Sequence, residues 1–347
     1  MRLLIVSDAW APQVNGVVTS LQALVGELRA MGHQVEVLSP QTFRCIPCPG
    51  YGEIPLAWNL WRVGPAIEAF APDGVHLATE GPLGWAARRW LLRRGLAFSS
   101  AVHTRFPEYL TARCAWVGLG VGYACLRLFH RHSQAVLVST ERLRAGLAQR
   151  GLRRLMLWRK GVDTRLFTPG QTVAVPVSAV FLYVGRLAPE KNLQAFLDLQ
   201  LPGERWVVGD GPQRQVLEQA YPQVKFFGYQ QGEALVDFYR RASVLVFPSL
   251  TDTYGLVMLE AQACGTPVAA FTVAGPLDVV VPGVTGVLAE DLRDACLAAL
   301  ELDRTRCAGE AARQSWRASA VEFIASQPLL DGAPACSERL ATAARSC

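Results

Sequence analysis

The sequence predicts an α/β protein built from two Rossmann-like domains with parallel sheets. Short, continuously apolar stretches recur along the chain, as expected for strands buried on both faces of a parallel sheet. Segments with apolar residues at helical spacing lie between them. The series occurs twice, on either side of a segment rich in Pro and Val near residues 168–176. At 347 residues, the chain is long enough for two domains with separate cores.

The first strand–helix–strand unit lies at the N-terminus. RLLIVSD (2–8) reads as a buried strand, and apolar residues at helical spacing follow from Val17 to Met31. Gly32 ends this helix, and QVEVLSP (34–40) is the next strand. Such a unit implies a right-handed crossover between parallel strands. Further strands of the first domain are predicted at GVHLAT (74–79), AFSSAVHT (97–104) and AVLVST (135–140).

The second series of strands begins with SAVFLYVGR. Its predicted members are SAVFLYVGR (178–186), RWVVGDG (205–211), VKFFGY (224–229), VLVFPS (244–249) and TPVAAFT (266–272). We therefore expect an N-terminal domain of residues 1–168 and a C-terminal domain of residues 177–310, facing each other across a cleft. In the remaining segment, 311–347, residues 312–326 are predicted to form a helix that crosses back to the first domain. The last twenty residues are expected to be poorly ordered.

Composition and cysteine usage indicate a compact cytoplasmic protein. The chain is 51% hydrophobic and 18% charged, and no apolar run reaches the roughly 18 residues that cross a bilayer. The apolar stretch before Asp8 is too short for a signal-peptide core. Nine cysteines are scattered, and Cys45 and Cys48 form a C-x-x-C pair without a second ligand pair. We expect reduced thiols and no metal site.

Positive charge is concentrated in one segment. Residues 85–160 hold 15 Lys or Arg against two acidic residues, a net +13, whereas the whole chain carries +5. Such asymmetry indicates an anionic partner (lipid, nucleic acid or phosphorylated substrate), although a solvated basic surface is an alternative.

The segment VGRLAPEKN (184–192) follows a strand and precedes a helix. It brings Arg186 and Lys191 to the carboxyl end of the second sheet. An Arg fork and a Lys point charge beside a helix N-terminus suit a diphosphate.

The stretch TDTYGLVMLEAQACGTPV (251–268) contains two carboxylates around a glycine turn. Asp252 lies in the loop after a buried strand, and Glu260 lies in the helix that follows Gly255. The backbone N–H groups of Gly255, Leu256 and Val257 are predicted to be unsatisfied donors that suit a diphosphate or a sugar. A carboxylate such as Glu260 can accept two hydroxyl hydrogen bonds from a ribose.

Three weaker signals accompany these segments. Gly16, in the loop PQVNGV, and Gly209, in VVGDGP, would let a backbone approach a phosphate or nucleotide, but turn chemistry explains both glycines equally well. His103 ends a strand of the first domain, and the nearby Arg105 and Glu108 favour a site over a core histidine.

The motifs VGRLAPEKN, GDGP, FFGY, KGVDTRLFTP and 244–268 together resemble GT-B glycosyltransferases of the family-4 type, over essentially the whole chain. The resemblance implies sugar transfer from a nucleotide donor with retention, without a metal or other cofactor. It implies that Arg186 and Lys191 hold the diphosphate, that Glu260 binds the ribose, and that Asp252 and His103 contact the donor sugar. The family has Glu where this chain has Asp252, one methylene shorter.

We expect a retaining hexosyltransferase that uses a UDP-sugar, or next GDP-mannose. Its hydroxyl acceptor is expected on a membrane glycolipid or diacylglycerol-type lipid, because the basic segment favours an anionic membrane surface. Arg105 and Glu108 would lie on the acceptor side. The alternatives are a soluble or polysaccharide acceptor, a nucleotide-sugar epimerase of the same fold, and a nonenzymatic binding protein. No nucleic-acid partner is expected.

The segment GWAARRWLLRRG (84–95) predicts contact with anionic lipid at the inner face of the membrane, because tryptophan and arginine together suit such an interface. The residues are Trp85, Trp90, Leu91 and Leu92 among Arg88, Arg89, Arg93 and Arg94. They do not form one apolar stripe, so we expect part of the segment to pack in the core.

Overall fold

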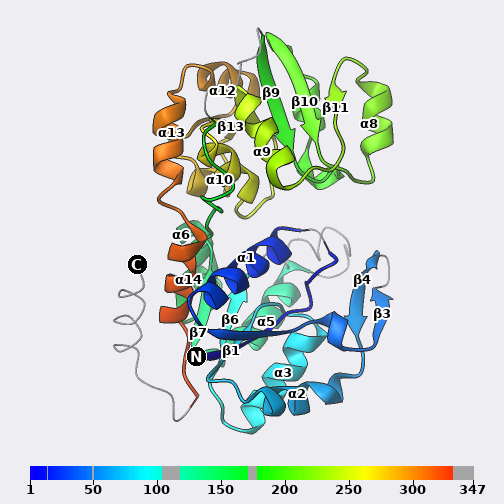
Figure 1. The fold of residues 1–347 in the computed structure, drawn as a ribbon. Coiled ribbons are helices and arrows are strands. Elements are labelled where there is room, and N and C mark those ends of the chain that lie inside the picture. The colour runs from blue at the N-terminus through cyan, green and yellow to red at the C-terminus, as the bar shows by residue number, and fades with distance from the viewer. Residues whose placement is uncertain (14, 49–50, 104–117, 171–177, 331–347) are drawn as a thin grey trace. The chain divides into compact units, whose positions relative to one another are not determined.

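The computed structural model describes residues 1–13, 15–48, 51–103, 118–170 and 178–330 (Figure 1). The chain divides into two compact units. Unit 1 is Met1–Arg159 together with the chain from Arg317 on, and unit 2 is Lys160–Trp316. The expected boundary near 168–176 lies later than this division, and residues 171–176 are outside the described part of the chain. Most of the C-terminal tail, residues 331–347, is outside it as well.

Unit 1 contains a parallel sheet with the strand order β2-β1-β5-β6-β7-β8. Its strands are β1 (Arg2–Val6), β2 (Gln34–Leu38), β5 (Gly74–Leu77), β6 (Ser99–Val102), β7 (Ala135–Val138) and β8 (Leu155–Leu157). Its helices are α1 (Gly16–Ala30), α2 (Val63–Phe70), α3 (Pro82–Arg93), α5 (Leu119–His130), α6 (Glu141–Gln149) and α14 (Trp316–Ala325), with 3-10 turns η1 (Pro40–Thr42) and η2 (Leu60–Arg62). An antiparallel hairpin, β3 (Cys45–Cys48) and β4 (Tyr51–Ala57), was not predicted from the sequence.

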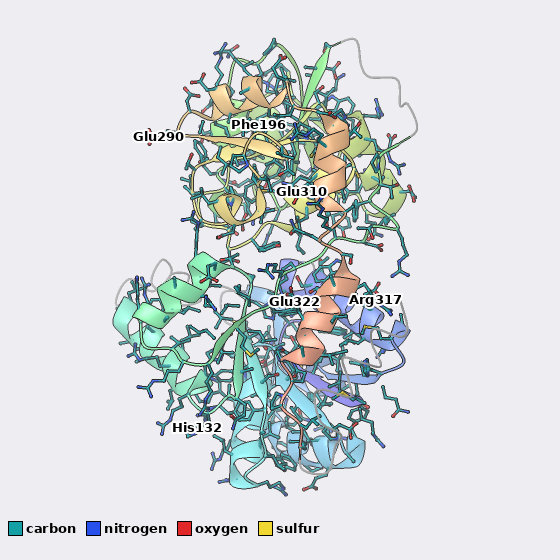
Figure 2. All side chains as sticks on the ribbon, turned by 90° about the vertical axis from the view of Figure 1, so that its left-hand side faces the viewer. His132, Phe196, Glu290, Glu310, Arg317 and Glu322 are labelled. Atoms are coloured by element: carbon teal, nitrogen blue, oxygen red, sulfur yellow. The ribbon has the colours of Figure 1, made fainter. Side chains whose placement is uncertain are left out.

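The last described helix, α14, packs on the core of unit 1. Phe323 and Ala320 are fully buried in one cluster with Leu24 and Trp158. The Trp158 indole N–H donates to the carbonyl oxygen of Ser319 (3.2 Å). Glu322, labelled on the same helix in Figure 2, forms a 3.0 Å ion pair with Arg159.

Unit 2 contains the second parallel sheet, with the order β11-β10-β9-β12-β13-β14. Its strands are β9 (Ala179–Val184), β10 (Gly203–Val208), β11 (Lys225–Phe226), β12 (Val244–Phe247), β13 (Val268–Phe271) and β14 (Gly286–Ala289). Its helices are η3 (Pro189–Lys191), α7 (Gln194–Leu197), α8 (Arg214–Ala220), α9 (Gly232–Arg241), α10 (Leu256–Ala263), α11 (Pro276–Val279), α12 (Leu292–Ala299) and α13 (Arg304–Ala311). The order reverses between β9 and β12, and ligands of open α/β sheets bind at the carboxyl ends of the strands at such a point.

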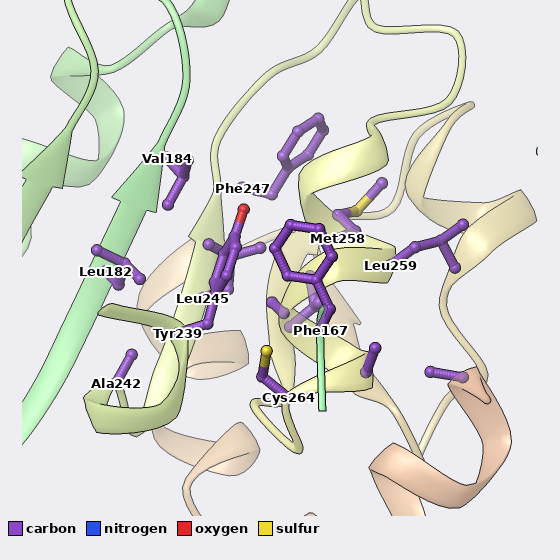
Figure 3. Packing of buried hydrophobic residues seen from close by; sticks show 14 of the residues in the cluster. Phe167, Leu182, Val184, Tyr239, Ala242, Leu245, Phe247, Met258, Leu259 and Cys264 are labelled. Atoms are coloured by element: carbon purple, nitrogen blue, oxygen red, sulfur yellow. The ribbon is translucent and has the colours of Figure 1, made fainter. Parts of the chain in front are cut away.

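One apolar cluster of unit 2 explains why the chain after Arg159 belongs to this unit. Val162 and Phe167 are buried among Tyr239, Leu245 and the other members of the cluster (Figure 3). The rings of Phe167 and Tyr239 meet edge-on at 5.9 Å between centroids. The segment that sequence reasoning assigned to the first domain thus buries its apolar side chains in the second. The prediction of two parallel-sheet Rossmann-like domains is confirmed.

Only some side chains of the basic segment of unit 1 are exposed to solvent. Arg88 is 8% exposed, and its guanidinium donates to the carbonyl oxygens of Phe129 (2.7 Å) and Leu128 (2.8 Å) at the end of α5. The ring of Trp85 packs edge-on against Phe129 at 5.1 Å.

Trp90 packs so closely on Gly64 that a Cβ there would lie 2.3 Å from the indole ring. Leu91 is fully buried, and Leu92 is half-buried. Arg88 and Leu91 thus pack in the core, as expected for part of this segment, and Trp85 and Trp90 are half-buried against it. The lipid contact of the segment stays a prediction. Arg89, Arg93 and Arg94 are exposed. No helix of the described residues is both long and apolar enough to span a bilayer.

Candidate active site

Two loops meet at the point where the strand order of unit 2 reverses. Residues 185–192 follow β9, and residues 248–255 follow β12. Because β9 and β12 pair in parallel, their carboxyl ends lie at the same edge of the sheet. Four of the predicted site residues, Arg186, Lys191, Asp252 and Gly255, are on these two loops.

The strongest contact between the loops is an ion pair. Lys191 Nζ lies 2.6 Å from Asp252 Oδ1, and the two side chains are 25% and 16% exposed. A short, charge-assisted bond in a half-buried setting fixes both groups at one edge of the sheet. The sequence predicted that Lys191 and Asp252 belong to the site, but it did not predict their ion pair.

Two further contacts hold the loops together. The Asn192 side-chain amide donates to the carbonyl oxygen of Pro248 (3.1 Å), and the Thr251 hydroxyl donates to that of Glu190 (3.3 Å). Asn192 has a left-handed backbone with φ of 52°, a conformation that asparagine tolerates better than most residues. Sequence reasoning missed Asn192, although an asparagine in a loop is a signal for a left-handed turn.

Arg186 is exposed, and a buried tyrosine holds its backbone carbonyl group. The buried Tyr183 hydroxyl donates to the carbonyl oxygen of Arg186 (2.9 Å). Burial, with the nearby Asp252 and Glu190 carboxylates, raises the pKa of Tyr183, so its hydroxyl remains a donor at neutral pH. The backbone of Arg186 is therefore held in place by a buried side chain.

Helix α10 begins at the site with an unusual turn. Its N-cap residue, Gly255, has φ of 83°, and a Cβ there would lie 2.8 Å from Met258 Cε and 2.9 Å from Phe247 Cζ. No described side chain caps this helix. The side chains of Leu256 and Val257 pack against the core, and their N–H groups belong to the uncapped first turn. Such a terminus attracts an anion.

Glu260 lies on the second turn of α10 and is held by a buried tyrosine. The Tyr239 hydroxyl donates to Glu260 Oε2 (2.8 Å). Burial raises the pKa of Glu260 to about 7, and the hydrogen bond from Tyr239 opposes that rise. The carboxyl group can thus change protonation near neutral pH. Tyr239 was missed because it lies in a helical apolar pattern that also reads as core.

The two weaker glycines have structural roles. A Cβ on Gly209, whose φ is 140°, would lie 1.9 Å from the carbonyl oxygen of Gly185, because the loops after β9 and β10 pack backbone against backbone. Gly16 begins α1, where the Asn15 side chain already accepts from the N–H groups of Val17 and Val18. The first-turn N–H groups of Val17 and Val18 are therefore already used within the helix.

In unit 1, His103 directly follows β6, and its ring lies edge-on to Trp158 at 5.7 Å between centroids. Arg105 and Glu108 are outside the described residues. A carboxylate that sequence reasoning missed lies at the end of β1. Asp8 accepts from the Thr79 hydroxyl (2.9 Å) and from the N–H groups of Leu83 (2.8 Å) and Gly84 (3.3 Å), and so caps α3. Its position after a strand was the available signal.

The site in unit 2 combines features that suit a phosphorylated, hydroxyl-bearing ligand. Arg186, Lys191 and the uncapped end of α10 supply positive charge, and Asp252 and Glu260 supply acceptors. All five lie on elements that follow two adjacent strands.

Comparison with known proteins finds family matches in both halves of the chain. The family model described as Glycosyltransferase Family 4 matches residues 14–166, and the one described as Glycosyl transferases group 1 matches residues 178–302. A GDP-mannose-dependent alpha-mannosyltransferase of Mycobacterium tuberculosis (strain CDC 1551 / Oshkosh) is 30% identical over 322 residues, covering 83% of each chain. Sulfoquinovosyl transferase SQD2 of Arabidopsis thaliana is 29% identical over 358 residues, covering 89% of this chain and 70% of the relative.

Among solved structures, sucrose-phosphate synthase from Thermosynechococcus elongatus is similar with a TM-score of 0.75 at 22% identity, covering 93% of this chain and 97% of the other. At 22% identity, that likeness shows only a shared fold. The family models and the relative at 30% identity show which family the chain belongs to. The chain therefore belongs to glycosyltransferase family 4 and is a glycosyltransferase with the GT-B fold.

Proposed function

We propose that this glycosyltransferase moves mannose from GDP-mannose to a hydroxyl group of a lipid acceptor, with retention of the anomeric configuration. The observation that carries the donor site is the Lys191–Asp252 ion pair beside the uncapped N-terminus of α10. It brings a cation for the diphosphate and a carboxylate for sugar hydroxyls to one edge of the sheet.

GDP-mannose replaces the UDP-sugar that the sequence alone favoured. The M. tuberculosis relative, similar over 83% of both chains, carries GDP-mannose in its name. The sulfoquinovosyl transferase relative supports another sugar as the second candidate. A panel of GDP- and UDP-sugars tested for thermal stabilisation separates them, since a ligand at 100 times its dissociation constant adds about 2.7 kcal/mol.

Arg186 and Lys191 hold the diphosphate in this proposal and stabilise its charge as it leaves. Glu260 accepts hydrogen bonds from the ribose, and Asp252 accepts them from the donor sugar. For His103 we keep the sugar contact that the family resemblance implies. Gly209 permits the close backbone packing of the loops after β9 and β10, whereas a Cβ on Gly16 would meet open space.

Retention follows from attack by the acceptor hydroxyl on the face that the diphosphate leaves, through an oxocarbenium-like state. No metal takes part. The expected product is the α-mannoside, read from the anomeric signals in an NMR spectrum of the purified product. A β-mannoside would overturn the retaining mechanism and leave the donor assignment intact.

The lipid acceptor rests on the basic segment 85–160, of which Arg89, Arg93 and Arg94 are exposed. We place the protein at the inner face of the membrane as a peripheral protein of the cytoplasm. A soluble or polysaccharide acceptor is the alternative, and a nucleotide-sugar epimerase of the same fold is the alternative reaction. Consumption of GDP-mannose with and without each acceptor tests all three, because an epimerase needs no acceptor.

A further inference from the structure

Two tryptophans of unit 1 are exposed to solvent beside the β3–β4 hairpin. Trp61 is 67% exposed and Trp58 is 45% exposed, and Ile46 on β3 is 53% exposed. Their flanking cations, Arg44 and Arg62, are also exposed. We call these five residues the hairpin patch; the β3–β4 hairpin, which carries Ile46, lies at one edge of unit 1 (Figure 1).

Hydrogen bonds hold the backbone of the hairpin patch in place. The backbone N–H of Trp58 donates to the carbonyl oxygen of Arg44 (3.0 Å), and the backbone N–H of Arg44 donates to the side-chain oxygen of Asn59 (2.9 Å). Asn59 is 2% exposed. The two indole rings meet edge-on at 5.4 Å between centroids and 69° between planes. The exposed rings therefore belong to an ordered surface.

This exposure differs from that of the tryptophans in α3. Trp85 and Trp90 are packed against Phe129 and Gly64, as described above. Trp58 and Trp61 contact each other and leave large parts of both rings in water. Large aromatic side chains are rarely left so exposed without a partner that covers them.

The chemistry of the hairpin patch suits one partner. Indole rings prefer the headgroup level of a bilayer, and arginine adds attraction to anionic lipid. Within the part of the chain that the structure describes, neither Arg44 nor Arg62 forms an ion pair, so their charge is available to a partner. An edge-to-face indole pair is less suited to a sugar, which needs a flat, open ring face.

We propose that the hairpin patch binds the surface of an anionic lipid bilayer, with Ile46 and both indole rings at headgroup level and the two guanidinium groups on lipid phosphates. This inference deepens the proposed lipid acceptor and rests on that part of the proposed function. It gives the membrane contact to residues 44–62 in place of the tryptophans of α3.

The test is sedimentation of the full chain with vesicles of phosphatidylcholine, with and without phosphatidylglycerol, at low and high salt. The wild-type protein should bind vesicles that contain phosphatidylglycerol and lose binding at high salt. The double variant Trp58→Ser/Trp61→Ser should partition at least about tenfold less. Partition of the Arg44→Gln/Arg62→Gln variant should fall about tenfold and should depend less on salt. This variant tests the proposal if the loss of both indoles unfolds the protein.

Matched controls come from exposed positions of unit 2. Val216 is 68% exposed, and Val216→Ser should leave partition unchanged. Arg306 and Arg313 are exposed as well, and Arg306→Gln/Arg313→Gln removes the same charge as Arg44→Gln/Arg62→Gln and should also leave partition unchanged. Vesicles with brominated acyl chains should quench the tryptophan fluorescence of the wild-type protein, and the Trp58→Ser/Trp61→Ser protein should lose most of that quenching.

Unchanged partition and quenching in both hairpin variants would overturn the inference, and so would a wild-type protein that binds no vesicle. Calorimetry of GDP-mannose binding on the same samples tests the proposed donor separately. Normal GDP-mannose binding without any vesicle binding would leave the donor site standing and would favour a soluble acceptor.

Discussion

Lys191 Nζ and Asp252 Oδ1 lie 2.6 Å apart although 61 positions separate the two residues in the sequence. Asp252 already accepts a hydrogen bond from the Lys191 ammonium, so a diphosphate that binds Lys191 must compete with Asp252 or share the ammonium with it. Asp252 therefore holds Lys191 in position and also weakens its attraction for an anion.

The first prediction separates these two effects. Lys191→Ala and Arg186→Ala should each weaken GDP binding by roughly 1.5–3 kcal/mol, because each removes a charge-assisted contact. Asp252→Asn should keep GDP affinity or raise it, since the competing charge is gone, while transfer of the sugar falls. Calorimetry with GDP and initial rates with GDP-mannose measure the two. Loss of GDP affinity in Asp252→Asn would contradict this division of roles.

The second prediction concerns pH. The pKa of Glu260 is raised to about 7 from an ordinary value near 4.5, so the folded protein holds this proton more tightly than the unfolded chain. The stability gained from the proton is fully present below about pH 4.5 and is lost as pH rises through about 7. Melting temperatures measured from pH 5 to 8 should fall less in Glu260→Gln than in the wild-type protein.

Binding adds a further test of the same carboxyl group. An ionised Glu260 accepts both ribose hydroxyls, so guanosine affinity should rise as pH passes about 7, and Glu260→Gln should abolish that rise. Guanosine avoids the titration of the diphosphate itself. In Tyr239→Phe the hydrogen bond that opposes the pKa rise is lost, so the midpoint should move to higher pH. An unmoved midpoint in this variant would show that Tyr239 does not act on Glu260.

The third prediction concerns the turn before α10. Gly255→Ala must keep a φ of 83° and brings a Cβ against Phe247 and Met258, so we expect a loss of about 1–3 kcal/mol of stability. Gly26→Ala, inside α1 with open space around the new Cβ, should stabilise by about 0.5–1 kcal/mol. Urea unfolding gives both values. Equal effects in the two variants would refute the strained turn.

The fourth prediction concerns Lys160, the first residue of unit 2. Burial lowers its pKa to about 7 from 10.5, so the unfolded chain binds this proton more tightly between these two values. Stability should therefore rise as pH increases from about 7 to 10.5. Lys160→Met keeps the aliphatic stem and should remove that rise. Chemical unfolding at pH 7 and 9 measures it, and an identical pH slope in both proteins would disprove the shift.

Sequence reasoning recovered the parts of the site that depend on local order. Arg186 and Asp252 were assigned to strand ends because each follows a continuously apolar run, and both lie there. The Lys191–Asp252 pair was beyond reach, because it depends on β9 lying next to β12, and strand order is a property of the assembled sheet.

The tryptophans show the same limit. Trp85 and Trp90 lie among arginines just as Trp58 and Trp61 lie near them, and nothing local distinguishes the two sets. The difference comes from Gly64 and Phe129, which are distant in sequence and cover the first set. Tyr239 was not identified for a related reason, since a tyrosine that is purely core and one whose hydroxyl reaches Glu260 give the same helical pattern.

The return of α14 to unit 1 has a consequence for the order of synthesis. On the ribosome, Leu24 and Trp158 emerge long before Phe323 and Ala320, the helix residues that cover them. Unit 2, Lys160–Trp316, is complete earlier than the cover of unit 1. The first half of the chain thus leaves the ribosomal tunnel with an apolar face uncovered, and chaperones that hold nascent chains would meet it there while the second unit folds.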